Sequence, residues 1–333
     1  MNRNKNIDVL GIGNAIIDVI ADADDDFLNE HGLNKGSMTL VDDEASDKLY
    51  DSMQKKIQLS GGSAANTIYG LSQLNCKCAF IGKRSNDALG DIFNNDLLSS
   101  DIEYNTKPLN SGQASARCLI LVTPDAERTM ATFLGSSSKL TVDDIDEDLI
   151  KKSKIVYLEG YLFDPPEAKE AFKHAAILAK RNNAKVAFTL SDAFCVDRHR
   201  QQMKEFIDNY VDILFCNEGE LKSLYEIDIF EEALIVLGGK VDIGVATRGE
   251  KGASIIHKEN IFKTDIRNTK VIDTTGAGDF FAAGFLAGLS KELSLSDSGD
   301  LGAICSSEII SHYGARPENN LKKFVEEKAG FKI

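Results

Sequence analysis

Short, mostly apolar runs alternate with longer amphipathic stretches along most of the chain. Runs of five to seven residues rich in Val, Ile, Phe and Ala are typical of strands buried on both faces of a sheet. Between them, 166–181 repeats Ala168, Phe172 and Ala175 at helical spacing. This alternation predicts an α/β fold with a doubly wound, mostly parallel sheet. The predicted strands are 78–82, 154–160, 185–191, 212–217 and 242–247.

Two segments, about 14–41 and 113–134, break this rhythm because they are rich in strand formers and contain no helical stretch of convincing length. The second predicts a hairpin around Pro124-Asp125. Ligands of such sheets bind beyond the carboxyl ends of the strands, so a small β-sheet placed there would act as a lid. We therefore expect a single α/β domain over 1–333 with this lid inserted into it.

Composition narrows the class of protein. The 333 residues include 43% hydrophobic and 27% charged residues, as in an ordinary globular protein. The net charge of −14 argues against a nucleic acid or an anionic membrane as partner. Neither an apolar leader nor a membrane-length apolar run is visible, which predicts a cytoplasmic protein. Six cysteines without a CxxC pair predict reduced core thiols.

The stretch 271–288, VIDTTGAGDFFAAGFLAG, places a carboxylate at the mouth of an apolar helix. We expect "KVID" to end a strand and "FFAAGFLAGL" to form a buried helix, whose first N–H groups would suit an anion. Gly276 and Gly278 would let the anion approach the backbone. Asp279 would either cap the helix or act as a general base, and this stretch alone favours the cap.

The other glycine-rich stretches exclude two common nucleotide sites. No GxxxxGK[ST] is present, and Ile16 stands where a dinucleotide site needs its third glycine. In GGSAANTIYGLSQL, Gly61 and Gly62 would allow close approach of a polyol, and Asn66 offers both a donor and an acceptor to hydroxyls. The alternative is a plain turn into a helix capped by Ser63.

Two longer stretches carry a family resemblance. GGSAANTIYGLSQLNCKCAFIGKRSNDALGD and DTTGAGDFFAAGF, about 200 residues apart, resemble the two signatures of the ribokinase-like (PfkB) family of carbohydrate and nucleoside kinases. The resemblance covers nearly the whole chain. It implies a doubly wound α/β fold with a β lid, and ATP-dependent phosphorylation of a hydroxymethyl group. It makes Asp279 the base, and the backbone of Gly276, Ala277 and Gly278 an anion hole for the phosphoryl group.

The same resemblance assigns residues to ATP and metal ions. Asn217 and Glu220, which are also spaced as a capping box, would organise Mg²⁺ near the phosphates, with Glu220 acting through water. A monovalent cation, often potassium, would lie beside the anion hole. Asp273 and Thr275 would bind this cation, whereas Thr247, Gly249 and Gly252 would line the ATP pocket.

The acceptor site points to one branch of this family. The opening GIGNAIIDV places Asn14 and Asp18 four residues apart, on one face of a helix or of a strand. It resembles adenosine kinases, in which a carboxylate here would bind a ribose diol. Arg128 would reach the phosphates as the lid closes, or would be a solvated lid charge. Phe194 would flank a purine, or would be core.

The resulting prediction is an ATP-dependent kinase that phosphorylates the 5′-hydroxyl of adenosine, with Asp279 as base. The expected cofactors are ATP and Mg²⁺, with K⁺ beside them, and the expected partner is a small nucleoside or sugar. A ribose- or fructose-type sugar kinase, or a non-catalytic nucleoside or sugar sensor, remains as an alternative. Either a monomer or a homodimer is compatible with the sequence.

Overall fold

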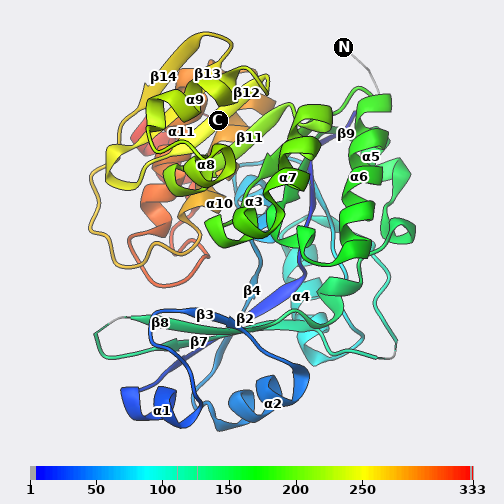
Figure 1. The fold of residues 1–333 in the computed structure, drawn as a ribbon, viewed down its shortest axis with the longest axis vertical. Coiled ribbons are helices and arrows are strands. Elements are labelled where there is room, and N and C mark those ends of the chain that lie inside the picture. Colours follow the sequence, from blue (N-terminus) through cyan, green and yellow to red (C-terminus); the bar gives the residue numbers. More distant parts are fainter. Residues whose placement is uncertain (1–4, 111, 126, 331, 333) are drawn as a thin grey trace.

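The computed structural model describes residues 5–110, 112–125, 127–330 and 332 (Figure 1). Its main sheet is parallel from β12 to β6, and a hairpin adds β13 and β14 in antiparallel pairing. The doubly wound, mostly parallel sheet is therefore confirmed. Its strands, in pairing order, are β14 (Asn260–Thr264), β13 (Ala253–His257), β12 (Ile243–Thr247), β11 (Ile213–Asn217), β10 (Lys185–Thr189), β9 (Ser153–Glu159), β1 (Ile7–Ile12), β5 (Cys78–Ile81) and β6 (Glu103–Tyr104).

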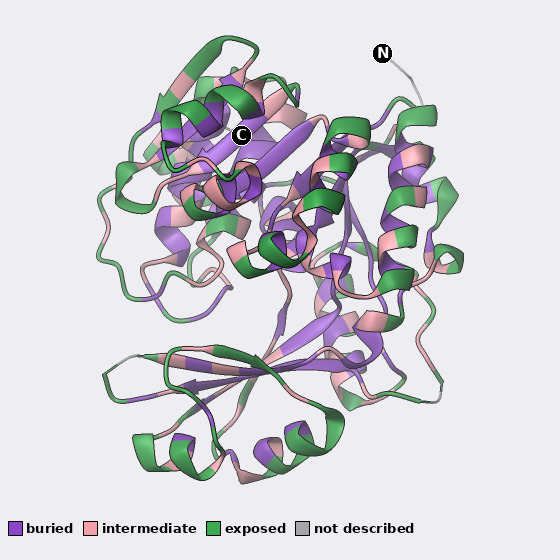
Figure 2. Cartoon of the chain, viewed as in Figure 1, coloured by how far each residue is buried: buried purple, intermediate pink, exposed green. Residues whose placement is uncertain are grey.

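Helices cover both faces of this sheet, and its central strands are largely buried, whereas the edge strand β14 is mostly exposed (Figure 2). Along β1, Val9 packs into the core on one face and Leu10 into the core on the other, because successive side chains alternate. One face carries α3 (Ser63–Gln73), α4 (Ala88–Ser99), α10 (Ala277–Ser290), α11 (Leu295–Ile309) and α12 (Leu321–Ala329). The other carries α5 (Glu147–Lys152), α6 (Pro166–Arg181), α7 (Ala193–Tyr210), α8 (Glu218–Tyr225) and α9 (Phe230–Gly238).

A second sheet lies beyond the carboxyl ends of the main strands (Figure 1). Its order is β3 (Met38–Leu40), β8 (Arg128–Phe133), β7 (Ala116–Val122), β2 (Ile16–Asp22) and β4 (Ile57–Gly61). β7 and β8 form the expected antiparallel hairpin, although residue 126 of its turn lies outside the described residues. The sheet also takes in β4, and 14–41 contains a short helix that the sequence analysis did not expect.

That helix, α1 (Asp25–Glu30), and α2 (Asp43–Ser52) cover the face of the second sheet that points away from the main domain (Figure 1). Leu28 and Leu49 of these helices pack in one core with the outward side chains of β2 and β7, which include Val19 and Leu119. The alternate side chains of β2 and β7 face the main domain. This inner face carries Asp18 among apolar residues: Ile16, Ile20, Ala116, Cys118, Ile120, Val122 and Met130.

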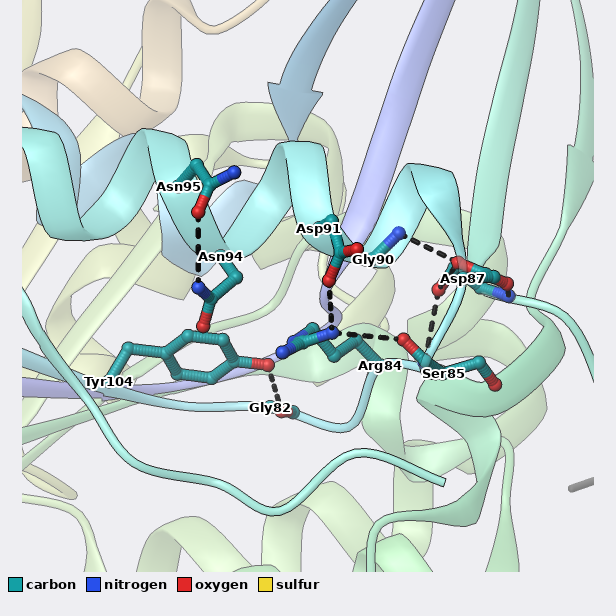
Figure 3. Close-up of polar contacts among 10 residues, drawn as sticks. Gly82, Arg84, Ser85, Asp87, Gly90, Asp91, Asn94, Asn95 and Tyr104 are labelled. Atoms are coloured by element: carbon teal, nitrogen blue, oxygen red, sulfur yellow. Dashed lines mark hydrogen bonds and ion pairs between the residues drawn. The ribbon is translucent and has the colours of Figure 1, made fainter. Parts of the chain in front are cut away.

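Asp87 joins the start of α4 to the base of this second sheet (Figure 3). Its Oδ1 accepts from the Gly90 N–H at 2.8 Å and from the Ser115 hydroxyl at 2.7 Å, and its Oδ2 accepts from the Ser115 N–H at 2.8 Å. Burial would raise its pKa, but these hydrogen bonds outweigh burial and lower it. The same loop is also held by Tyr104 of β6, which donates to the Gly82 carbonyl at 2.8 Å. The 82–91 part of the first signature therefore fixes the root of β7.

One sequence prediction is wrong here. "KVID" does not end a strand, because β14 stops at Thr264 and 265–276 runs as irregular backbone. Val271 and Ile272 are exposed, and Ile272 makes a single backbone bond, from its N–H to the Ile310 carbonyl at 2.8 Å. The turn before α10 is therefore held by the segment after α11. The six cysteines are buried and unpaired as expected. Among the described residues, no helix has the length and apolarity to cross a membrane.

Candidate active site

The candidate residues gather at the carboxyl ends of the central strands, where β1 pairs with β5 on one side and with β9 on the other. Open α/β sheets bind their ligands at such a switch point. Asn14 follows β1, and Glu159 ends β9. The Glu159 carboxylate accepts from the Asn14 N–H at 2.9 Å, from the Asn14 side-chain amide at 2.5 Å and from the Ala64 N–H at 2.7 Å.

Glu159 thus ties together β1, β9 and the start of α3. It is fully buried, and burial raises its pKa to about 7 against the lowering effect of its three hydrogen bonds. Asn14 precedes β2 instead of lying within it, so the alternation of that strand does not aim its side chain along with Asp18. The predicted substrate residue Asn14 is instead oriented by Glu159, which the sequence analysis did not identify.

Close packing of α3 against α10 brings the two signature motifs together. A Cβ on Gly70 of α3 would lie 2.8 Å from the Ala283 Cβ of α10, so only glycine fits this contact. The Thr67 hydroxyl donates to the Asp279 carbonyl at 3.1 Å. The two helices therefore present their N-terminal turns to the same space.

Asp279 receives two hydrogen bonds across this contact. Ser63 Oγ donates to its Oδ1 at 2.7 Å, and Asn66 Nδ2 donates to its Oδ2 at 3.1 Å. Burial raises the pKa of Asp279, whereas these two donors and the positive charge of Arg316 lower it. Its side chain makes no cap bond to α10, and the N-cap position belongs to Gly276. Asp279 is thus a half-buried carboxylate with a raised pKa, which suits a general base.

The alternative role for Ser63 as a helix cap is wrong. Gly62, with φ 92°, occupies the N-cap position of α3, and Ser63 is the first helical residue. A Cβ on Gly62 would lie 2.6 Å from the Asn14 carbonyl oxygen, which explains why glycine is needed there. The Ser63 hydroxyl is therefore free of the cap and contacts Asp279.

The predicted anion hole lies at the first turn of α10. Gly276 has φ 76°, and a Cβ there would lie 2.8 Å from the Ala315 Cβ. At Gly278 a Cβ would meet no protein atom within 4 Å. Gly276 is therefore explained by the fold, whereas no protein contact explains a glycine at 278. Together with Ala277, these residues place N–H groups of a helix N-terminus beside Asp279.

Asp18 of the second sheet faces this turn. Its carboxyl atoms lie 2.4 Å from where a Cβ on Gly61 would stand, so Gly61 makes room for the carboxylate. Burial raises the pKa of Asp18 to about 6, Arg316 and Arg128 lower it, and Asp279 raises it. The charge of Asp279 thus reaches Asp18, which is consistent with both carboxylates lying near the junction of the second sheet and the main domain.

Arg128 also crosses from the second sheet to the main domain. Its Nη2 lies 2.5 Å from Asp273 Oδ2, and its Nη1 donates to the Thr275 hydroxyl at 2.6 Å. Asp273 further accepts from the N–H groups of Thr275, at 3.0 Å, and Gly314, at 2.8 Å. The guanidinium thus contacts the residues predicted to bind a monovalent cation. In this arrangement Arg128 takes the place beside these oxygens that a cation would occupy, and the monovalent-cation site stays a prediction.

The predicted nucleotide residues lie at the carboxyl ends of β11 and β12 and in the segments that follow them. Asn217 pairs in register with Thr247. Asn217 and Glu220 form the capping box that their spacing indicated: Glu220 N–H donates to Asn217 Oδ1 at 2.8 Å, and Asn217 N–H donates to Glu220 Oε2 at 3.0 Å. Burial raises the pKa of Glu220 to about 7, with Asp192 and Asp279 adding to it. Gly249 and Gly252 bound the following turn with φ 56° and 77°.

One predicted contact stands apart from this cluster, and Arg316, like Glu159, was not predicted from the sequence. Phe194 is 76% exposed in the first turn of α7, and its purine contact stays a prediction. Within the described part of the chain, no three His, Cys, Asp or Glu residues are grouped to hold a metal ion. Arg316, which contacts Asn66 and influences both Asp18 and Asp279, lies outside both signatures. Its position in a loop after α11 left no sequence signal.

Comparison with known proteins bears on this geometry. The sequence profile described as "pfkB family carbohydrate kinase" matches residues 8–322. Guanosine-inosine kinase from Escherichia coli is 29% identical over 226 residues, covering 65% of this chain and 52% of that protein. The chain therefore spans about half the length of that relative. Adenosine kinase 2 from Arabidopsis thaliana is 24% identical, covering 94% of this chain and 97% of that protein.

Solved structures resemble this one along nearly its whole length. A probable sugar kinase from Rhizobium etli is 40% identical with a TM-score of 0.91, covering 98% of this chain and 99% of the other. Adenosine kinase from Sinorhizobium meliloti is 39% identical with a TM-score of 0.91, covering 97% and 99%. The fold with its large and small sheets is thus shared with these proteins.

Proposed function

Because the chain belongs to the pfkB family of carbohydrate kinases, which are phosphotransferases acting on an alcohol group, we propose that it transfers the γ-phosphate of ATP to the 5′-hydroxyl of adenosine. The observation that carries this proposal is the Asp279 carboxylate at the N-terminus of α10, held by Ser63 and Asn66 and facing Asp18. This arrangement provides a base, an anion site and a diol ligand around one space.

In the proposed reaction, Asp279 accepts the proton of the 5′-hydroxyl as its oxygen attacks the γ-phosphorus. The hydrogen bonds from Ser63 and Asn66 fix the carboxylate while the proton moves. The N–H groups of the first turn of α10 stabilise the charge on the transferring phosphoryl group, and their fixed positions avoid the cost of reorganising solvent. Asp18 accepts hydrogen bonds from the ribose hydroxyls.

The inner face of the lid supports a nucleoside over a free sugar. Asp18 is surrounded there by apolar side chains, including Ile20, Ile120 and Met130. Ile20 and Leu59 lie 4.0 Å from where a Cβ on Gly314 would stand, so this face meets the main domain across the site. A purine would bury apolar area against such a wall, whereas a free sugar would leave it without a partner. The sugar kinase is the second candidate, favoured by the likeness to the Rhizobium etli protein.

The ATP phosphates would lie between α10 and the start of α8. Glu220 offers a buried carboxylate whose pKa is raised by burial and further by the negative charge of Asp192 and Asp279, a setting that a cation would stabilise. The residues therefore fit Mg²⁺ held mainly by phosphates and water, with Glu220 in the outer shell. When bound, Mg²⁺ neutralises phosphate charge. Thr247, Gly249 and Gly252 would border the nucleotide.

The test measures ATP consumption with adenosine, inosine, guanosine, ribose and fructose in the presence of Mg²⁺, with and without K⁺. We expect turnover with adenosine and its loss in Asp279→Asn, because an amide cannot accept the proton. Isothermal titration of ATP into Asp279→Asn should still show binding, which separates loss of the base from loss of the fold.

The outcomes discriminate between the candidates. Turnover with ribose or fructose alone would overturn the nucleoside acceptor but keep the kinase. Preference for guanosine or inosine would replace adenosine by another purine nucleoside. Full activity in Asp279→Asn would refute the role of Asp279 as the general base. Adenosine binding without any phosphorylation would favour the sensor.

A further inference from the structure

The segment after α11 is firmly held beside the candidate site. Glu308 is buried, and its carboxylate accepts from His312 Nε2 at 3.2 Å, from the Asn319 N–H at 3.0 Å and from the Asn319 side-chain amide at 3.0 Å. The Gly314 N–H donates to Asp273 at 2.8 Å. These contacts fix both ends of the loop that carries Arg316. The backbone position of Arg316 is therefore fixed by contacts of the main domain.

The Arg316 side chain is only 12% exposed and makes three contacts. Its Nη1 donates to Asn66 Oδ1 at 3.1 Å, and its Nη2 pairs with Asp96 Oδ2 at 3.1 Å. The guanidinium also lies over the Tyr69 ring, 4.1 Å from the centroid. Since Asn66 and Tyr69 are one turn apart on α3, Arg316 is locked against the helix that supplies the partners of Asp279.

We propose that Arg316 is a positioning residue for the base: it holds the Asn66 amide with its oxygen outward and its NH₂ group toward Asp279, and it places a positive charge beside that carboxylate. An amide has a donor end and an acceptor end. If Asn66 turned over, its oxygen would face the Asp279 carboxylate and repel it. Arg316 can only donate, so it binds the oxygen and enforces the productive orientation. What this does for catalysis rests on the proposed kinase function.

The charges around Asp279 show why a cation is needed there. Asp18, Glu159 and Glu220 all interact unfavourably with its negative form. Arg316 opposes them by lowering the pKa of Asp279. It also lowers the pKa of Asp18, more strongly than Arg128 does. The titratable and charged groups that influence the Asp279 carboxylate, or are influenced by it, are Asp18 of β2, Tyr157 and Glu159 of β9, Tyr161 after β9, Glu220 of α8 and Arg316; its side-chain hydrogen-bond partners are Ser63 and Asn66 of α3.

The experiment compares Arg316→Met and Arg316→Lys with wild type and with Arg117→Met as a matched control. Arg117 is a second buried arginine, which pairs with Ser46 and Asp47 on the outer side of the lid. The measurement is the pH dependence of kcat/KM for the best nucleoside, whose acidic limb reports the free base. We expect Arg316→Met to move that limb to higher pH by about one unit, so that kcat/KM at low pH falls roughly tenfold.

Arg316→Lys keeps the positive charge, so its acidic limb should lie close to that of wild type. Its kcat should stay reduced, because a lysine ammonium holds the Asn66 amide less firmly than the planar arginine guanidinium does. Arg117→Met should lower stability without moving the limb. An unmoved limb in Arg316→Met, or an equal shift in Arg117→Met, would overturn the proposal.

A measurement independent of turnover separates this proposal from the proposed function. In protein with ¹³C-labelled aspartate carboxyl groups, the signal absent from Asp279→Asn identifies Asp279. Its titration midpoint should rise in Arg316→Met whether or not any acceptor is phosphorylated. An unchanged midpoint would refute the role of Arg316 while leaving the kinase assignment intact.

Discussion

Gly278→Ala separates a glycine required by the fold from one required by a ligand. A Cβ at 278 would meet no protein atom within 4 Å, and the backbone there does not adopt a positive φ. The residue lies in the first turn of α10, where alanine forms helix more readily than glycine. Nothing in the protein itself therefore opposes the substitution.

The structure sets the expected magnitudes. Replacing glycine by alanine in a helix stabilises a protein by about 0.5–1 kcal/mol, so Gly278→Ala should match or exceed wild type in stability. Gly276→Ala is the contrast, because it combines φ 76° with a Cβ only 2.8 Å from Ala315, and it should lose roughly 1–3 kcal/mol. The stability of Gly278→Ala should not be matched by its activity. A methyl group in the predicted phosphoryl space should reduce kcat about 100-fold, the usual effect of losing one oxyanion donor.

The assay pairs thermal unfolding with steady-state kinetics on the same preparations. The expected result is a Gly278→Ala protein at least as stable as wild type but nearly inactive. If this variant were stable and fully active, the first turn of α10 could not be the anion site. If Gly278→Ala were clearly less stable than wild type, the conclusion that a Cβ at position 278 meets no protein atom would be wrong.

Two further predictions test the acceptor side and the buried carboxylate. In Gly61→Ala the new methyl would stand 2.4 Å from the present Asp18 carboxyl atoms and would displace that carboxylate. The KM for the acceptor should therefore rise roughly tenfold or more, while the KM for ATP is unchanged. Equal changes in both KM values would contradict the assignment of Asp18 to the acceptor. Burial raises the pKa of Glu159 from 4.5 to about 7, so its protonated form stabilises the fold below pH 4.5 and this contribution is lost as pH rises through 7. By denaturation at pH 5 and 7, wild type should lose about 2 kcal/mol of unfolding free energy that Glu159→Gln does not, and parallel pH dependences would refute this.

The strands of the main domain were predictable because burial on both faces of the sheet determines both their apolar sequence pattern and their place in the structure. A parallel strand buried on both faces must be apolar throughout, and the five predicted strands lie within a residue or two of β5, β9, β10, β11 and β12. The lid was harder. α1 is six residues long and begins in the acidic run 22–26, so it has no apolar stripe, and its cap bond from Phe27 N–H to Asp24 is invisible in a residue pattern.

The candidate site was predictable only where a motif supplied it. Asp279 and Glu220 stand in short patterns that define their neighbours along the chain. Ser63, Glu159 and Arg316 act through contacts between residues 95 to 250 positions apart, such as Ala64 with Glu159 and Asn66 with Arg316. Such contacts follow from the packing of α3 and from a loop fixed by Glu308, neither of which leaves a periodic signal.

The charges in the site also explain why its two arginines come from different parts of the fold. Arg128 belongs to the second sheet and pairs with Asp273 of the main domain at 2.5 Å, so this contact must break whenever the lid moves away. Arg316 stays with the main domain, bound to α3 and Asp96. An opening lid would therefore remove Asp18 and Arg128 together, leaving Asp279 with Arg316 as its compensating cation. If Asp279 is the proposed base, it would then keep its orientation and much of its charge balance while acceptor and product exchange, because Arg316 is held by the main domain.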